Sequence, residues 1–510
     1  MRAWKRGSLG SIDRRKFVQL CAGSLALSAV GCAPGMDRAS ARGNKVIVPY
    51  TPSMEGPFGL GAPSLLFISL VRFTERGDLE GHLARSWEHS ADFRSWTYHL
   101  RTDVRWHDGA PVSAHDVKFT LDLLSRPESA QFLPFESIDV LDDWTVAVRS
   151  GHGLHYQTQA CWPKHLLERL DPRSLYRWDF WTHAVGNGPY RFMRYVPETM
   201  VELEANPDYY RGKPKIDRVV LKFSEQAGLT ELLSGNVDVM SGNVARFRSE
   251  NLDPRLRLYY WYEDTSARGI YWQNQHPLFR DPRVRRALTL AINRRELLPV
   301  INVPGDVTLV DGPYTLRQLR RGQLPAPLPY DPEQARALLD AAGWHDRDGD
   351  GVRERDGQGF RFTAIVFQPP YPTIAQYVQD QFHRVGVHMD LQPLDDSVVT
   401  ERLKRGAFEA AFATLWGSRW LLDKPSSIGY ENPAFFALFQ RAKDTADPDE
   451  EDRTYRELAN IVRADAPVTF LCPKVDLDVV HRRVRGLSSP WRANPVEFME
   501  YLWLEPDGRR

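Results

Sequence analysis

The sequence has little of what defines several large classes of protein. Only 4 of its 510 residues are cysteine, and 66 basic side chains balance 66 acidic ones. Balanced charge argues against a nucleic-acid binder, because such proteins usually carry a strongly basic face. The motifs H-E-x-x-H, C-x-x-C, G-x-x-x-x-G-K-[ST] and G-x-S-x-G are missing, and the 14 histidines are scattered. The sequence therefore predicts neither an enzyme nor a cofactor or metal site.

Long apolar runs are also missing. No stretch after residue 32 has 18 consecutive apolar residues, which predicts a soluble body. The run 17–30 (FVQLCAGSLALSAV) is too short to span a bilayer as a helix, and it follows a cationic segment that ends in Arg14, Arg15 and Lys16. A charged start, a short apolar run and small residues beyond it are typical of a secretory signal.

Two details refine this signal. Arg14-Arg15, followed by Lys16-Phe17-Val18, resembles a twin-arginine export signal. The segment 29–32 (AVGC) resembles a bacterial lipobox, although leucine is more usual than alanine at its first position. We predict that 1–32 is a lipoprotein signal peptide, that Cys32 receives the lipid and that 33–44 is a linker. The alternative is an ordinary signal with an accidental cysteine.

Export changes the charge and the cysteine count. The leader carries six basic residues and one acid, so its removal takes the net charge from 0 to −5. Cys21 leaves with the leader, while Cys161 and Cys472 stay in an oxidising compartment. These two cysteines either pair or remain as small buried side chains.

The body alternates strand, turn and helix signals. The run 45–49 (KVIVP) predicts a strand, and 95–101 alternates apolar and polar residues as a half-buried strand does. Asp108-Gly109 marks a turn, and Ser113 is placed to cap a helix over 116–124. This alternation predicts an α/β fold.

The segment 83–119 carries a longer pattern. It reads Leu83-Ala84, Ser86-Trp87, Leu100-Arg101, Val104, Trp106-His107-Asp108-Gly109, Pro111, Ala114, Asp116-Val117 and Phe119. Further matching segments follow in order: Pro163-Lys164-His165-Leu166, Gly186-Asn187-Gly188-Pro189-Tyr190, 206–212 (NPDYYRG), 277–288 (PLFRDPRVRRAL), 291–294 (AINR), 330–333 (YDPE) and 341–344 (AAGW). Together they resemble the extracellular solute-binding proteins of family 5, the peptide- and nickel-binding receptors of ABC importers.

The resemblance implies an α/β, periplasmic-binding-protein-like clamp of two lobes (class II) with an extra subdomain in the first lobe. We place lobe one at 45–265 plus 485–510, its subdomain at 85–180 and lobe two at 266–484. It also implies a non-enzymatic, exported monomer of the periplasm or cell envelope without a cofactor. Its expected partners are a small peptide-like solute, an ABC permease with its ATPase, and the membrane through the lipid anchor.

Peptide-binding members carry a W-x-x-D-Y-type segment late in lobe two, whose Asp pairs with the ligand's α-ammonium group. The matching segment here is 412–420, in which Trp416 fits the Trp but Arg419 stands where the Asp is expected. Arg offers a planar fork that suits a carboxylate or a phosphate. The resemblance therefore predicts a ligand that has no free amino terminus at this point or that presents an anion to Arg419. The alternative is a shifted alignment in which Asp423 supplies the acid.

We expect Trp416, Trp420, Tyr271, Trp272 and Asn274 to line the ligand site, with core packing as the alternative for each aromatic residue. The leading function is capture of a peptide-like solute for import. The alternatives are a non-peptide or anionic solute, such as a metal chelate or an oligosaccharide, and an envelope sensor that does not transport.

Two further patterns have plain interpretations. The segment 346–351 (DRDGDG) resembles the start of a calcium loop, but its twelfth position is Gly357 rather than a bidentate Glu, so we expect a solvated turn. The helix predicted from Pro282 carries arginines that we expect on a solvated face: Arg283, Arg285, Arg286, Arg294 and Arg295.

Overall fold

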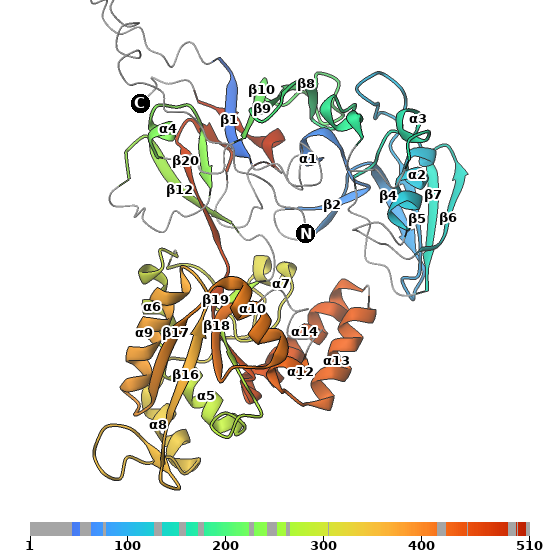
Figure 1. The fold of residues 1–510 in the computed structure, drawn as a ribbon. Helices are drawn as coiled ribbons and strands as arrows, with labels where there is room; N and C mark the ends of the chain where they lie inside the picture. The colour runs from blue at the N-terminus through green and yellow to red at the C-terminus, as the bar shows by residue number, and fades with distance from the viewer. Residues whose placement is uncertain are drawn as a thin grey trace, which may run out of the picture. The chain divides into compact units, whose positions relative to one another are not determined.

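The structure is a computed structural model with α-helices and mixed β-sheets (Figure 1). It describes residues 43–50, 63–74, 78–126, 135–151, 160–171, 178–223, 229–241, 252–261, 266–303, 305–415, 425–445, 447–487, 496 and 498–505. Cys32 and the predicted signal and linker fall outside these residues. No helix of the described chain is long and apolar enough to cross a membrane.

Two large hydrophobic cores divide the described chain. One is formed by residues between Val46 and Trp261 together with residues between Val480 and Leu502. The other is formed by residues between Tyr260 and Val475. We call the parts around these cores the first lobe and the second lobe.

Two sheets of the first lobe meet where β1 of one contacts β11 of the other. One has the order β1-β10-β9-β8, and the other has the order β11-β20-β12. The bounds are β1 (Lys45–Tyr50), β8 (Tyr190–Val196), β9 (Met200–Ala205), β10 (Arg218–Phe223), β11 (Val239–Ser241), β12 (Leu256–Trp261) and β20 (Asp476–His481). The strand predicted at 45–49 is confirmed as β1.

The pairing of β20 places the return of the chain to the first lobe before residue 476. Strand β20 pairs with both β11 and β12, with Trp261 opposite Asp476. The sequence puts this boundary at 484–485, because the run 476–481 (DLDVVH) is as compatible with one lobe as with the other. Only the backbone pairing decides between them.

A buried ion pair joins these sheets. Arg483 donates to both carboxylate oxygens of Asp238, Nε to Oδ1 at 2.7 Å and Nη2 to Oδ2 at 2.8 Å. The backbone N–H of Ile47 donates to the same carboxylate at 2.8 Å, and Arg483 also donates to the carbonyl of Lys45. Asp238, which directly precedes β11, has no exposed surface, and Arg483 follows β20. The pair therefore links β1 to the β11 and β20 segments.

A separate four-stranded sheet carries the segment with the family pattern. Its order is β4-β5-β7-β6, and helix α2 packs against β6 and β7. The bounds are β4 (Ala84–His89), β5 (Ser95–Leu100), β6 (Phe135–Asp142), β7 (Thr145–Ser150) and α2 (Ala114–Leu124). The predicted strand at 95–101 and the helix after Ser113 are thus both confirmed.

The glycines of Gly186-Asn187-Gly188 lie against another segment of backbone. A Cβ atom at Gly186 would stand 1.9 Å from the carbonyl oxygen of Leu66, and one at Gly188 would also collide with the Leu66 carbonyl. His107 braces the same motif: its Nδ1 accepts from the N–H of Gly186 at 3.1 Å, and its Nε2–H donates to the carbonyl of Gly188 at 3.2 Å. Burial lowers the pKa of His107 to about 4, so the ring is neutral and structural, as its turn position predicts.

The second lobe is built on a five-stranded sheet of order β17-β16-β18-β13-β19. The bounds are β13 (Ala267–Trp272), β16 (Arg361–Val366), β17 (His388–Pro393), β18 (Ala410–Leu415) and β19 (Val468–Pro473). Strands β16, β17 and β18 run parallel, whereas β13 runs antiparallel to both of its neighbours.

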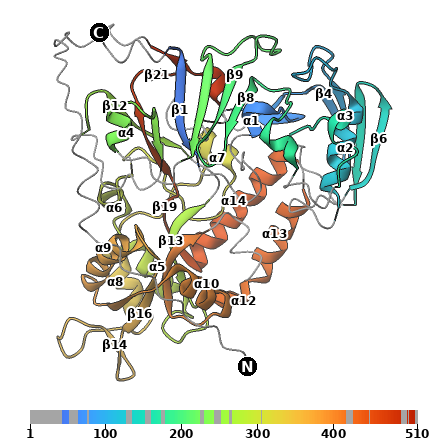
Figure 2. The same ribbon diagram turned by 45° about the horizontal axis from the view of Figure 1, so that its top comes forward.

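Helices accompany this sheet. Helices α13 and α14 pack on each other side by side, as both views show (Figures 1 and 2). The bounds are α5 (Pro282–Leu290), α6 (Arg294–Val300), α7 (Leu316–Arg321), α8 (Pro332–Ala341), α9 (Tyr371–His383), α10 (Asp396–Arg405), α12 (Pro425–Ile428), α13 (Pro433–Asp444) and α14 (Pro448–Asp465).

The prediction of a solvated arginine face from Pro282 is wrong for two residues. Arg285 and Arg294 are each only 4% exposed. Arg285 donates to the carbonyls of Asp465, Ala466 and Phe279, and Arg294 pairs with Asp311. Both side chains donate hydrogen bonds to backbone carbonyls of segments that lie far away in the sequence. The apolar stripe along one helix does not reveal such partners.

Both remaining cysteines are free thiols. Cys161 is buried in the first-lobe core and Cys472 in the second-lobe core. The structure thus has no Cys161–Cys472 disulfide. Burial raises the pKa of both thiols, so they behave as small apolar side chains.

Candidate functional site

The order of strands in the second lobe points to one edge of the sheet. The chain leaves β16 through α9 to reach β17 on one side, then passes through α10 to β18 on the other side of β16. In an open α/β sheet, ligands bind outside the carboxyl ends of the strands where the connections change direction. This switch point lies at the carboxyl ends of β16 and β18.

The antiparallel strand β13 contributes to the same edge. Its first residues stand beside the last residues of β18, with Arg268 opposite Thr414 and Ala267 opposite Leu415. Strand β19 ends there as well, with Pro473 opposite Ala267. We call the described residues at this edge, Arg268, Tyr371, Thr414 and Cys472, the edge cluster.

Hydrogen bonds hold the edge cluster together. The Tyr371 hydroxyl, at the start of α9, lies 2.6 Å from Oγ1 of Thr414, and the Tyr271 hydroxyl donates to the Thr414 carbonyl at 3.0 Å. Burial raises the pKa of Tyr371 to about 12, while the hydrogen bond from Thr414 and the charge of Arg268 act in the opposite direction. The phenol is therefore neutral at physiological pH and can only donate or accept a hydrogen bond.

Arg268 is the charged member of the edge cluster. Its Nη2 donates to the carbonyl of Val475 at 3.4 Å, and its guanidinium also hydrogen-bonds the Cys472 thiol, which opposes the effect of burial on the pKa of that thiol. A neutral phenol, a hydroxyl and a cation suit recognition of a polar or anionic group. Sequence reasoning missed Arg268, although a charged residue within the apolar strand ARGIYW was a visible signal.

Two of the predicted site residues are packed in the core. Tyr271 is 1% exposed and Trp272 has no exposed surface. The Trp272 ring lies 4.9 Å from that of Phe279 between centroids, and its Nε1–H donates to Oγ1 of Thr469 at 3.1 Å. Tyr271 and Trp272 thus have packing roles in this structure, and their contact with a solute stays a prediction.

Asn274 acts as a brace just after β13. Its Nδ2 donates to the carbonyls of Trp272 at 2.9 Å, Ile428 at 3.0 Å and Pro467 at 3.2 Å. These bonds connect β13 to the ends of α12 and α14, so this residue shapes the lobe. Trp416, Arg419 and Trp420 follow β18 in the sequence and lie outside the described residues.

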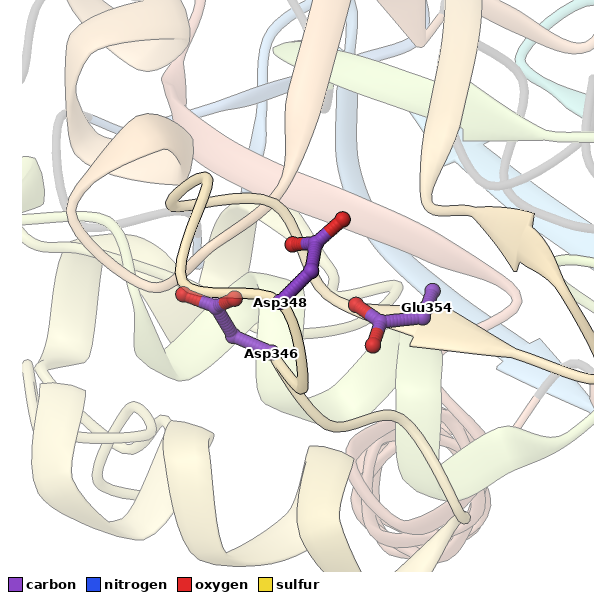
Figure 3. Close-up of side chains that lie close together, drawn as sticks. All are labelled: Asp346, Asp348 and Glu354. Atoms are coloured by element: carbon purple, nitrogen blue, oxygen red, sulfur yellow. The ribbon is translucent and has the colours of Figure 1, made fainter.

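Two aspartates of the DRDGDG segment and Glu354 form the one group of acidic side chains close enough to hold a metal ion among the described residues. Figure 3 shows Asp346, Asp348 and Glu354, whose carboxylates lie within 4.8 Å of one another. Their oxygens already accept backbone hydrogen bonds: Asp346 from Gly349 at 2.8 Å, and Glu354 from Arg347 at 2.7 Å. Glu354 reaches the turn through its backbone pairing with His345, which the spacing of a calcium loop does not predict. Hydrogen bonds from the backbone of the turn to these carboxylates therefore account for its conformation without a bound ion.

The fold and the edge site define a solute-binding protein of two lobes. The sequence matches the family of bacterial extracellular solute-binding proteins, family 5, over residues 78–433. The chain belongs to this family, as the segments between Leu83 and Trp344 indicate.

Similar proteins differ in the ligands that their names state. The oligopeptide-binding protein AppA of Bacillus subtilis is 24% identical over 441 residues, which cover 80% of each chain. The nickel-binding periplasmic protein of Escherichia coli is 24% identical over 443 residues, covering 80% of this chain and 81% of the relative. The structure of NikZ from Campylobacter jejuni with Ni(L-His) superposes with a TM-score of 0.67 at 22% identity, covering 90% of this chain and 99% of the other. This structure shares the periplasmic-binding-protein fold with the chain.

Proposed function

We propose that the chain is the substrate-binding component of an ABC importer and that it captures a peptide or peptide-like solute between its two lobes. The family match over 78–433 carries this proposal. The similarity to AppA, which is named for oligopeptide binding, supports a peptide as the solute. The protein then works in the periplasm or cell envelope without catalysing a reaction, and it hands the solute to a permease.

The lipid anchor is a separate part of the proposal and rests on the segment AVGC alone. A cell that expresses the full chain and is fed radiolabelled palmitate is expected to label the protein. The Cys32→Ser variant is expected to remain unlabelled, whereas equal labelling of both proteins refutes Cys32 as the attachment residue.

Native mass spectrometry of the chain from Ala33 onward, purified without denaturation, tests the ligand class. A bound species that fragments as a peptide supports peptide capture. An adduct that contains nickel, or an oligosaccharide, refutes peptide capture. It favours the second candidate, a metal chelate or other non-peptide solute, which the similarity to the nickel-binding relative supports.

The role of Arg419 is tested on whatever ligand is bound. A carboxylate stabilises an ammonium group, and a guanidinium in its place repels it. We expect Arg419→Ala to weaken an anionic ligand by about 10-fold or more, since a hydrogen bond to a charged group contributes about 1.5–3 kcal/mol. Unchanged binding would refute a role for Arg419 and favour the alternative, in which Asp423 supplies the acid that pairs with the ligand's ammonium group.

A further inference from the structure

Arg268 is half-buried, and its guanidinium is satisfied differently from those of three other arginines in the second lobe. Arg294 pairs with Asp311 and donates to three backbone carbonyls, and Arg285 donates to four. Arg317 pairs with Asp452. These arginines have acceptors for their donors inside the fold, so their structural roles account for them.

The guanidinium of Arg268 is left incomplete. Its Nη1 is shielded from solvent, and no group of the described chain accepts a hydrogen bond from it. Among the described residues no carboxylate forms an ion pair with Arg268. Its contacts are the Val475 carbonyl at 3.4 Å, which is long, and the Cys472 thiol, which is a weak acceptor. A buried donor without an acceptor is costly, so such a group in a folded protein needs an explanation.

Three other arginines in the described chain have a shielded nitrogen without an acceptor: Arg257, Arg286 and Arg463. Arg257 belongs to β12 in the first lobe, and Arg286 and Arg463 belong to helices α5 and α14. Arg268 alone among these four stands at the carboxyl edge of β18, where the change in strand connections favours a ligand.

We propose that Arg268 binds a carboxylate of the captured solute, with Nη1 as the donor that the ligand completes. The hydroxyls of Tyr371 and Thr414, 2.6 Å apart beside it, supply neutral polar neighbours that do not compete for the cation. A carboxylate accepts from a guanidinium in a charge-assisted, planar arrangement that a neutral carboxamide does not reproduce. This inference rests on the proposed function and assigns a specificity-determining residue to it.

The test uses the chain from Ala33 onward and two synthetic tripeptide libraries made without aspartate or glutamate. One library ends in free carboxylates and the other in carboxamides, so the terminal group is the only carboxylate that differs. Binding is measured by native mass spectrometry, and the tightest peptide is then titrated by calorimetry as acid and as amide. The variants are Arg268→Gln and Arg268→Lys, with Arg361→Gln as the matched control.

Arg361 suits as a control because it lies at the amino end of the same sheet, exposed and 3.4 Å from Asp350. Its change removes the same charge at the edge opposite to the proposed site. Thermal melting of every variant shows whether the fold is kept. Arg268→Lys retains the charge if Arg268→Gln fails to fold.

The expected result is that Arg268→Gln binds the free-carboxylate peptide about 10-fold to 100-fold more weakly, that Arg268→Lys falls between, and that Arg361→Gln matches the wild type. The amide is expected to bind all four proteins alike. If acid and amide bind the wild type equally well, the assignment of Arg268 is overturned while peptide capture stands. If neither library binds the wild type, peptide capture itself fails, and the assignment fails with it.

Discussion

The ion pair between Asp238 and Arg483 allows a quantitative test of how the first lobe is held together. Asp238→Asn keeps the shape of the side chain but removes the charge, and it leaves the Arg483 guanidinium buried without a counterion. Breaking a buried pair by changing one partner costs about 3–5 kcal/mol. Since the same carboxylate accepts from the N–H of Ile47, strand β1 should loosen first.

Two measurements test this prediction. Chemical denaturation followed by fluorescence should show a lower midpoint for Asp238→Asn, and hydrogen exchange at Ile47 should accelerate by roughly two to four orders of magnitude. Asp208→Asn is the matched control, because Asp208 pairs with Arg191 in the same lobe but with 78% of its side chain exposed. That pair should contribute about 1 kcal/mol or less.

A second change separates the charge from the packing. In Asp238→Asn/Arg483→Met the orphaned guanidinium is gone, so the double variant should lose less than the sum of the two single changes. The reasoning is refuted if Asp238→Asn and Asp208→Asn unfold at the same denaturant concentration, or if the exchange of Ile47 is unchanged.

Three further predictions follow from side chains with defined partners. Asn274→Asp should destabilise the second lobe by about 3 kcal/mol, because it replaces a donor to three carbonyls with an acceptor. The control is Asn293→Asp, which keeps the cap of helix α6 and should be tolerated in the same denaturation assay. His107 is neutral in the fold with a pKa of about 4 but titrates near 6.5 when unfolded, so its contribution is complete above pH 6.5 and is lost as the pH falls toward 4. The loss approaches about 3 kcal/mol, at about 1.4 kcal/mol per pH unit, and His107→Gln should flatten the pH dependence of stability in this window; equal slopes for both proteins contradict the assignment. Finally, the chain from Ala33 onward should show no thiol that reacts at pH 8 until it is denatured, and two thereafter, whereas a disulfide would leave none.

The sequence predicts much of the fold because local rules operate there. The strand at 45–49, the strand at 95–101 and the helix after Ser113 each follow from periodicity or a cap, and the family pattern adds the two-lobe architecture. These features depend on neighbours in the sequence or on segments with a long shared pattern.

The remainder depends on partners distant in the sequence. Arg285 and Arg294 are charged, as surface residues usually are. Their guanidinium groups nevertheless donate hydrogen bonds to backbone carbonyls about 180 residues away in the sequence. Tyr271 and Trp272 pack in the core because β13 is a central strand with neighbours on both sides, and their contact with a solute stays a prediction. The edge cluster forms only when β13, β18, β19 and α9 meet, and no spacing in the sequence encodes that meeting.

The chain enters and leaves the second lobe through paired strands. Trp261 stands opposite Asp476 where β12 and β20 end, and Ala267 stands opposite Pro473 where β13 and β19 begin their pairing. Opposed residues of antiparallel strands lie about 5 Å apart, so the second lobe begins and ends at neighbouring points. It is in effect an inserted domain, one that can be excised as residues 266–474, with the first lobe rejoined between Trp261 and Asp476 by a short hairpin turn. Solute specificity could then be exchanged between relatives by transplanting a single continuous segment of chain.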